Sequence, residues 1–477
     1  MFTKGFDEKI QFRGGMLGLV VPFIVLFAGI IMLSMSGKAM PMAFWVPALA
    51  AVLAALLMSR NPTQCAETLI QGMSSEMVAI MLMAWFLAGI VAQLMKETGL
   101  IQGLIWLSLN VGLKGAFFPL ITFICGSLLS TATGTALGTV IALAPILYPV
   151  GVAMGANPPV MAAAIVSSAY FGDNIAPVSD TTIASAYTQG VDVSDVVRSR
   201  LKYALAAAAI ASVLFLIFGG SGSSAEPDLS FVGELSPHGL IMLLVPALLI
   251  FLMYRGVHLI VALMSAGCIG IILGLATGLL PFSRLLVVDM DAFVVSGVIV
   301  EGIQSLIDIA IFAMLLMGLI NLLDKGGFFD WMIKALSNYT KDDRSAELVV
   351  ALIDVVLCLL TVANSVVIVL EGPIAKKVLV DTHDISPDRS ANILDAVSCV
   401  AMCLIPYSFA PLLTYMFAGG SGAPVNFSVN YMVLFSFHGW ALGAVMLFAM
   451  ITGWGRTHGS SKETAGKQAA GGETHEA

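Results

Sequence analysis

The chain has 477 residues, of which 58% are hydrophobic and only 11% are charged, and its formal net charge is −8. A soluble domain carries roughly a quarter charged residues, so a soluble surface built from this composition would have to be largely apolar. The composition therefore excludes an ordinary soluble domain and predicts a protein whose surface is solvated largely by lipid.

Apolar runs recur along the chain, and a helix needs about 20 such residues to cross the hydrocarbon core of a bilayer. The runs lack the period-two alternation of a β-barrel, so we expect helices, which satisfy their own backbone hydrogen bonds in lipid. We predict an all-α polytopic membrane protein with about 10–13 membrane segments. The predicted spans are 16–35, 41–58, 77–95, 116–153 (broken), 157–190 (broken), 203–219, 239–254, 257–280, 293–323, 347–379 (broken), 392–417 and 431–453.

The ends and loops of the chain predict its orientation. Charged residues precede the first span and no small-residue cleavage site follows it, so residues 16–35 are predicted to be a retained helix rather than a signal peptide. Basic residues cluster at the N-terminus, after the last span and in two loops, one of which holds Arg198, Arg200 and Lys202. The positive-inside tendency places these clusters and both termini in the cytoplasm, at what we expect to be a bacterial inner membrane.

A polar segment divides the hydrophobic chain into two similar halves. We predict a first membrane half at 1–218, an external linker at 219–238, a second membrane half at 239–455 and a disordered cytoplasmic tail at 456–477. Residues 127–147 and 357–379 are both apolar runs interrupted midway by small, hydroxyl or amide residues. This weak correspondence favours an internal duplication, which is a common architecture of transporters.

The segment GDNIAPVSDTTIASA, residues 172–186, carries the most informative chemistry. Asp173 and Asp180 lie seven residues apart, and Pro177 between them removes a helical N–H, so carbonyls nearby should lose their usual partners. Carbonyl, carboxylate and hydroxyl oxygens are hard ligands that suit Na⁺, and a carboxylate can hold a proton instead. The alternative is a polar loop outside the membrane, although this segment contains neither Lys nor Arg.

Two further interruptions are predicted to lie near this segment. Residues 130–139, STATGTALGT, supply Thr133 and Thr135 beside glycines, and the pattern predicts the tip of a re-entrant hairpin. The alternative is a helix-packing face of small residues, in which each Thr bonds its own helix. The counterpart in the second half is residues 361–365, where Asn364 and Ser365 break an apolar run.

Other acidic residues lie inside or beside apolar segments of the second half. Asp395 is four residues into an apolar helix that Pro406 then breaks, but it could equally be interfacial. Asp354 is flanked by apolar residues, whereas Glu371 is followed by two lysines and could simply pair with them. Each could carry a proton or belong to a structural ion pair.

Enzyme, channel and nucleic-acid functions have less support in the sequence. The six histidines are scattered, no nucleophile motif, metal-binding motif or ATP-binding loop is present, and no basic stretch is long enough for nucleic acid. We expect the cysteines, most of which lie inside apolar runs, to be buried free thiols. We therefore expect a transporter without enzymatic activity or a cofactor, with a channel or membrane-embedded enzyme as the alternative from another class.

These motifs resemble the NhaC family of Na⁺/H⁺ antiporters. The family pattern G-D-K-x-S-P-x-S-D-T-T is matched by GDNIAPVSDTT at 172–182, and G-T-x-x-G-T is matched at 134–139. A third pattern, around Asp395 and the following 404–407, is matched in part. The sequence departs from the family at Asn174, Ala176, Leu394 and Tyr407, which removes one base and one acid near the expected site.

The resemblance implies two inverted repeats, each with a re-entrant hairpin and a broken helix, and a homodimer that works by alternating access with competing Na⁺ and H⁺. The alternative is a Na⁺- or H⁺-coupled carrier of an organic acid or amino acid, which the missing charges favour. Expected partners are membrane lipid and a small ion or small-molecule substrate, with Na⁺ and H⁺ as coupling ions. The predicted Na⁺ ligands are Asp173, Asp180 and Thr181, within a site that comprises Asp173, Asn174, Ser179, Asp180, Thr181, Thr182, Thr133, Thr135, Asn364, Ser365 and Asp395.

Overall fold

The computed structural model describes residues 10–36, 42–112, 115–177, 179–220, 234–255, 257–291, 293–328, 331 and 340–459. In these ranges, seven helical segments are long and apolar enough to cross a membrane, and shorter apolar helices accompany them. The predicted all-α polytopic membrane fold is thereby confirmed. The seven segments are Met16–Leu33, Val78–Glu97, Ala136–Ala153, Val193–Phe218, Leu259–Ala276, Ile307–Lys325 and Pro387–Gly420, the last of which contains a break.

The first half of the chain consists of helices joined by short turns: α1 (Met16–Met35), α2 (Trp45–Met58), α3 (Pro62–Met73), α4 (Glu76–Glu97), α5 (Leu100–Val111), α6 (Phe118–Thr133), α7 (Ala136–Ala153), α8 (Pro158–Ile175), α9 (Asp180–Gln189) and α10 (Val193–Phe218). Single 3-10 turns, η1 (Met42–Phe44) and η2 (Gly115–Phe117), precede α2 and α6.

The second half begins with η3 (Pro237–Leu243), α11 (Leu244–Tyr254), α12 (Leu259–Ala276) and η4 (Phe282–Arg284). A small antiparallel hairpin follows, in which β1 (Val287–Asp289) pairs with β2 (Val294–Ser296) in the register Val287 to Ser296. The remaining elements are α13 (Val298–Gln304), α14 (Ile307–Lys325), α16 (Asp343–Thr361), α17 (Asn364–Ala375), the π-helical η6 (Lys376–Thr382), α18 (Pro387–Leu404), α19 (Phe409–Gly420), α20 (Val429–Val433) and α21 (Phe437–Thr452).

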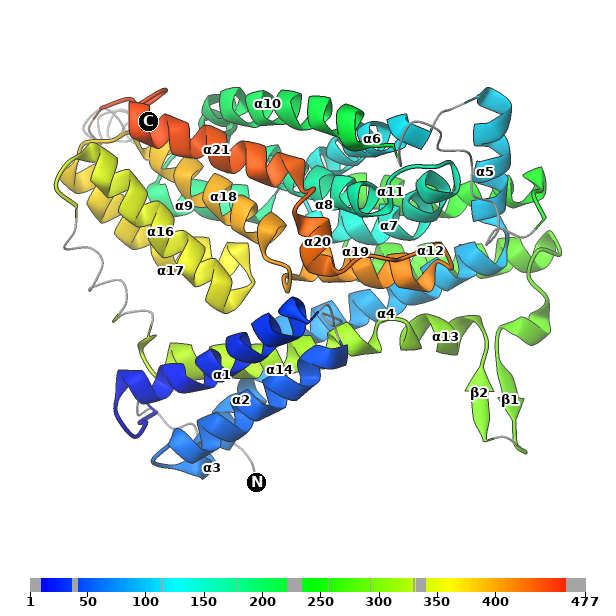
Figure 1. The fold of residues 1–477 in the computed structure, drawn as a ribbon, viewed down its shortest axis with the longest axis horizontal. Coiled ribbons are helices and arrows are strands. Elements are labelled where there is room, and N and C mark those ends of the chain that lie inside the picture. Colours follow the sequence, from blue (N-terminus) through cyan, green and yellow to red (C-terminus); the bar gives the residue numbers. More distant parts are fainter. Residues whose placement is uncertain are drawn as a thin grey trace, which may run out of the picture.

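The helices form two groups (Figure 1). In the view shown, α1, α2, α3 and α14 lie together at the bottom, while α8, α9, α10, α18 and α21 lie above them, with α16 and α17 at the left end of the upper group. Within the lower group α1 packs on α2 and α3 on α14; within the upper group α6 and α7 pack on α8, α10 on α21, and α16 on α18. The upper group therefore contains the segments that the sequence motifs single out.

Helix α8 lies inside the upper group because its small residues allow close packing. Every residue from Pro159 to Ile175 is buried. At Gly172, an added Cβ atom would lie 2.3 Å from the Cβ of Ser130 and from the backbone nitrogen of Thr131 on α6. The absence of a side chain at Gly172 thus lets α6 and α8 touch backbone to backbone, one residue before Asp173.

The same backbone features recur in the two halves. The α6–α7 turn passes through left-handed Gly134 and then extended Thr135, and the α16–α17 turn passes through left-handed Val362 and then extended Ala363. Both α8 and α18 begin with proline, at Pro158 and Pro387, and both break before a second helix. Single β-bridges precede them, joining Ala156 to Gly220 and Ile385 to His458. This order of features supports the predicted duplication, while the inverted orientation and the re-entrant hairpins stay predictions.

Two boundaries differ from the sequence-based expectation. Helix α10 begins at Val193, well before the span predicted at 203–219, and it includes Arg200, which had been assigned to a cytoplasmic loop. Residues 456–459, predicted to belong to the disordered tail, are held by contacts, since Arg456 pairs with Glu347 and His458 with Asp343. Most of the predicted linker, 221–233, and residues 460–477 lie outside the described residues.

Candidate functional site

The break between α8 and α9 follows from Pro177. Proline lacks a backbone N–H and disfavours the helical conformation of the residue before it. Accordingly Ala176 is extended, with φ −71° and ψ 126°, and α9 starts again at Asp180 after the extended N-cap Ser179. The break leaves Asp173 in the last turn of α8 and Asp180 in the first turn of α9, as the sequence predicted.

Asp173 is buried at this break among hydroxyl and amide donors. Its Oδ1 accepts a hydrogen bond of 2.8 Å from the Ser179 hydroxyl, and its Oδ2 accepts one of 3.2 Å from the Asn364 amide of α17. The hydroxyls of Ser179 and Thr181 lie 2.8 Å apart. A cluster of oxygen atoms thus surrounds the Asp173 carboxylate, and Asn364 is the side chain from the second half of the chain that hydrogen-bonds it among the described residues.

Asp180 is exposed and is held from two directions. Its Oδ1 accepts a 3.1 Å hydrogen bond from the backbone N–H of Thr181, which places the carboxylate at the positive end of α9. Its Oδ2 accepts a hydrogen bond from the Ser365 hydroxyl of α17. Neighbouring residues at the tip of the α16–α17 hairpin, Asn364 and Ser365, therefore contact the two carboxylates on either side of the α8–α9 break.

A cavity of about 390 Å³ opens between these elements. Asp173 and Asp180 line it, together with Thr135 of the α6–α7 turn and with Asn364 and Ser365 of the α16–α17 turn. The rest of the lining is largely apolar and aromatic: Met81, Ala136, Leu137, Tyr170, Val362, Ala363, Val366, Met402 and Phe409. Its volume lies at the lower end of the range for small-molecule pockets, roughly 300–1,000 Å³, and so exceeds the need of a single bare ion.

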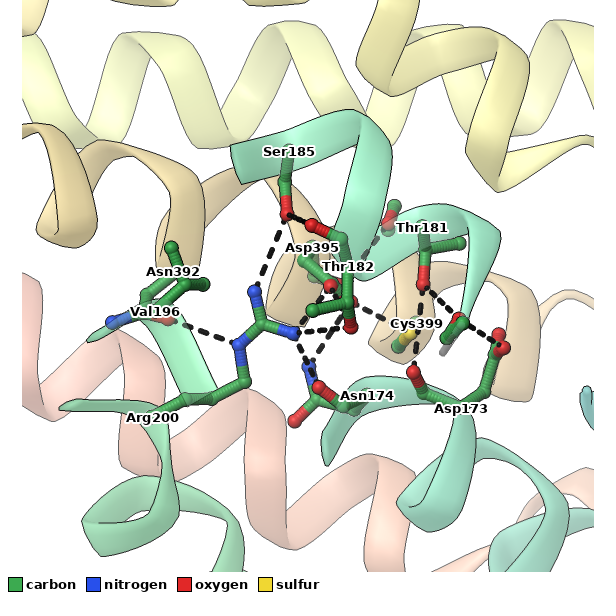
Figure 2. A network of polar contacts seen from close by, with 12 residues as sticks. Asp173, Asn174, Thr181, Thr182, Ser185, Val196, Arg200, Asn392, Asp395 and Cys399 are labelled. Carbon is green, nitrogen blue, oxygen red and sulfur yellow. Dashed lines mark hydrogen bonds and ion pairs between the residues drawn. The ribbon is translucent and has the colours of Figure 1, made fainter. Parts of the chain in front are cut away.

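A second polar cluster lies beside the cavity and is centred on Arg200 of α10 (Figure 2). Arg200 and Asp395 form an ion pair in which both side chains are fully buried. The guanidinium also donates to the Asn392 side chain at 2.9 Å and to the Thr182 hydroxyl at 3.0 Å. Since α8, α9, α10 and α18 all contribute to this cluster, it fixes the broken helix α8–α9 against α18.

The remaining contacts of Asp395 complete this cluster. Its Oδ1 accepts a 3.2 Å hydrogen bond from the Asn174 amide, and its Oδ2 accepts one of 3.1 Å from the Thr182 hydroxyl. Asn174 stands where the family pattern has Lys, so an amide dipole and the Arg200 guanidinium together face the carboxylate. The base that the motif lacks at position 174 is thus supplied from α10.

The predicted site residues therefore separate into two groups. Asp173, Asp180, Thr135, Asn364 and Ser365 line the cavity, and Ser179 and Thr181 support Asp173. Asn174, Thr182 and Asp395 belong instead to the Arg200 cluster and do not line the cavity. The side chain of Thr133 lies outside the described residues.

Arg200 is the site residue that the sequence reasoning missed. Its position between Arg198 and Lys202 predicts a cytoplasmic loop, whereas the helical periodicity of the segment indicates a buried position. The buried residues of α10 are Val196, Arg200, Tyr203, Ala204, Ala207, Ala211 and Phe215, which recur at helical spacing. Arg200 lies on this apolar stripe, and because α10 begins at Val193 the stripe includes it and buries it.

The site offers oxygen ligands rather than a transition-metal centre. Among the described residues, no group of three or more His, Cys, Asp or Glu side chains could hold a metal ion. Two carboxylates with adjacent hydroxyls are instead hard oxygen donors, which match alkali and alkaline-earth cations in chemistry. A small hard cation or protons can therefore bind here and offset the negative charge of the two carboxylates.

Comparisons with known proteins agree with the motifs. The sequence model of the Na⁺/H⁺ antiporter family matches residues 11–220. The chain is 36% identical over 121 residues to the malate-2H⁺/Na⁺-lactate antiporter of Bacillus subtilis, covering 25% of this chain and 26% of that protein. It is 25% identical over 289 residues to the Na⁺/H⁺ antiporter NhaC of Alkalihalophilus pseudofirmus, covering 57% and 61%.

The chain also aligns with a solved structure of MtrF from Neisseria gonorrhoeae, whose description names a class of antimetabolite efflux pumps. The alignment covers 94% of this chain and 96% of the MtrF chain, at 12% sequence identity and a TM-score of 0.37. That similarity is too low to support a statement about fold or function. The matches to the curated relatives span about a quarter and three fifths of their lengths. Both relatives are antiporters rather than enzymes. Residues 11–220, which include the motif at 172–182, are therefore similar to the Na⁺/H⁺ antiporter family, and the resemblance predicted from the motifs is confirmed.

Proposed function

We propose that this protein is a secondary active transporter that exchanges Na⁺ for H⁺, with the two ions competing for Asp173 and Asp180. The observation that carries the proposal is the contrast between three neighbouring carboxylates. Asp395 has a buried guanidinium partner in Arg200, whereas the donors to Asp173 and Asp180 within the described ranges are hydroxyl, amide and backbone groups.

Competition follows from this distribution of charge. A carboxylate buried in a membrane protein is costly unless its charge is neutralised. Arg200 already neutralises Asp395, so the buried Asp173 must obtain compensation from a mobile cation or a proton, and the exposed Asp180 lines the same cavity and can share that cation. Protonation removes the negative oxygen ligand that Na⁺ needs, and bound Na⁺ in turn disfavours the proton. The same two side chains therefore suffice for exchange.

Contacts with the α16–α17 hairpin link ion binding to movement. Asn364 donates to Asp173 and Ser365 donates to Asp180, so the hairpin tip and the α8–α9 break share two hydrogen bonds. A cation bound between the carboxylates would draw on the same oxygen atoms, together with the Thr181 hydroxyl. Occupancy of the site then biases the position of the tip, which is the requirement for alternating access.

The second candidate function is a Na⁺- or H⁺-coupled carrier of an organic acid or amino acid. A cavity of about 390 Å³ with Tyr170, Met402 and Phe409 in its wall favours this candidate, because a bare ion leaves most of the volume unfilled. The relative from Bacillus subtilis is named for both Na⁺ and organic acids. Two unneutralised carboxylates would repel an organic anion, so this carrier would need its cations to bind first.

Localisation and assembly complete the proposal. The chain would lie in a bacterial inner membrane with both termini in the cytoplasm, as a homodimer in contact with lipid, and would need neither a cofactor nor nucleic acid. Arg198 and Lys202, which lie near the start of α10, still support this orientation, whereas Arg200 is paired inside the protein.

The test is Na⁺-driven proton movement in proteoliposomes that contain a pH-sensitive dye. We expect a Na⁺ pulse to change the internal pH with the wild-type protein but not with Asp173→Asn or Asp180→Asn. Asp195→Asn, an exposed carboxylate in the first turn of α10, is the matched control and should behave as wild type. Full exchange by Asp180→Asn would refute the assignment of the site. A wild type that responds to Na⁺ only when an organic or amino acid is present would favour the second candidate.

A further inference from the structure

The α16–α17 hairpin encloses two more carboxylates, which the proposed exchange site does not use. Asp354 of α16 and Glu371 of α17 are both fully buried, with 0% of each residue exposed. They lie on the two helices of one hairpin, which pack against each other. Neither lines the cavity at the hairpin tip.

These carboxylates are poorly supplied with hydrogen-bond donors. Asp354 Oδ1 accepts only a weak S–H contact from Cys358, at 3.3 Å. Asp354 Oδ2 and both carboxyl oxygens of Glu371 have no hydrogen-bond partner among the described residues. The two lysines that follow Glu371 in the sequence, at 376 and 377, form no ion pair with it in the described structure, so the interfacial pairing considered from the sequence is absent.

Glu347, on the same helix as Asp354, is a buried carboxylate that this fold supplies with counter-ions. It too is fully buried, but Arg389 contacts it at 2.9 Å and Arg456 at 2.7 Å. Among the described residues, neither Asp354 nor Glu371 has an ion-pair partner of this kind. The Cys358 thiol of α16 contacts Asp354, and Asp395 on the packed helix α18 already has its counter-ion in Arg200.

Helix α9, which packs against α17, contributes no cation to offset the charge of Glu371. Helix α9 contacts α17 at Gly372, where an added Cβ atom would lie 2.4 Å from the Cβ of Thr188. The Gln189 side-chain amide donates to the Gly372 carbonyl at 2.9 Å, and is therefore not directed at the Glu371 carboxylate. Two buried carboxylates without a counter-ion avoid the cost of desolvated charge by binding protons.

We infer that Asp354 and Glu371 form a second proton-binding site, enclosed in the α16–α17 hairpin and separate from the cavity where Na⁺ and H⁺ compete. The inference deepens the proposed exchange and rests on it for its role in transport. Glu371 lies seven residues after Asn364, about two helical turns along α17. A movement of α17 that breaks the contact between Asn364 and Asp173 therefore also moves the Glu371 carboxyl, so that its proton is released or taken up in step with the ion at the tip.

Two measurements test the site, on purified wild-type protein and on Asp354→Asn and Glu371→Gln. Infrared spectroscopy at neutral pH should show the carbonyl stretch of a protonated carboxylic acid, which weakens in each single variant. Glu347→Gln is the control, since that carboxylate is paired with Arg389 and Arg456 and its loss should leave the band unchanged. Thermal stability should be kept in Glu371→Gln, which replaces one neutral group by another, and lowered in Glu347→Gln, which strands two guanidiniums.

Transport supplies the second readout. Glu371→Gln cannot lose its proton equivalent, so Na⁺-driven proton movement should slow by at least about tenfold, while Na⁺ binding at the cavity stays close to wild type. A missing infrared band, a band unchanged in both single variants, or wild-type exchange rates in both would overturn the inference. A wild type without Na⁺-driven proton movement would contradict the proposed function alone, because the band reports protonation without transport.

Discussion

Arg200→Gln removes a fully buried cation that contacts several residues of the predicted site. In the wild type, Arg200 pairs with Asp395 and also donates to the Asn392 and Thr182 side chains, at 2.9 and 3.0 Å. Breaking a buried pair on one side strands the other charge, which costs about 3–5 kcal/mol. We therefore expect Arg200→Gln to lower the free energy of unfolding by about 3–5 kcal/mol, measured by thermal or denaturant unfolding in detergent.

A second substitution distinguishes stranded charge from lost packing. Adding Asp395→Asn to Arg200→Gln removes the uncompensated carboxylate, so the double variant should recover a large part of the stability that the single variant loses. Arg198→Gln, an exposed neighbour on the same helix, is the control and should change stability by less than about 0.5 kcal/mol. Wild-type stability in Arg200→Gln, or no recovery in the double variant, would refute the role assigned to the pair.

Two other predictions concern packing and pH. Gly172→Ala should destabilise the protein by about 1–3 kcal/mol and weaken Na⁺ binding in a calorimetric titration. The new methyl group would lie 2.3 Å from the Cβ of Ser130 and push α8, with Asp173, away from α6. Unchanged stability would contradict the close packing of the two helices. The hydrogen bond with His458 is the main cause that lowers the pKa of Asp343, outside the predicted spans, below its usual 3.8. The stability from this contact is complete above that ordinary pKa and is lost as pH falls through the lowered one. As pH falls from about 5 to 3, the His458→Ala variant should therefore lose less stability than the wild type, by under about 1 kcal/mol. Equal losses in thermal unfolding at acid pH would contradict a stabilising role for this contact.

The sequence predicted the parts of the site that depend on local backbone chemistry. Pro177 breaks the helix between the two aspartates because it lacks a donor and restricts Ala176. Gly134 ends α6 in the left-handed region with φ 66°, as a glycine within a hydroxyl-rich turn suggested. The second hairpin turns at Val362 with φ 51°, which no local rule favours for a β-branched residue.

What the sequence could not predict depends on contacts between distant segments. Arg200 and Asp395 are separated by almost 200 residues, so nothing local indicated that one would neutralise the other. The local sequence instead predicts a cytoplasmic loop for Arg200 and leaves open whether Asp395 lies in the membrane or at its surface. Glu371 shows the opposite case, since its nearness to lysines in the sequence suggested an ion pair that the described structure does not contain. Helical periodicity along α10 was the one local signal that could have identified Arg200.

Competition between Na⁺ and H⁺ at Asp173 and Asp180 is tested most directly by measuring the Na⁺ dissociation constant of the purified protein across a range of pH. If one proton must leave before Na⁺ binds, the apparent constant falls about tenfold for each pH unit on the acid side and levels off on the alkaline side. Asp180→Asn should remove this dependence or abolish binding. A wild-type dissociation constant that does not change with pH would contradict the account, because Na⁺ and H⁺ would then occupy different groups.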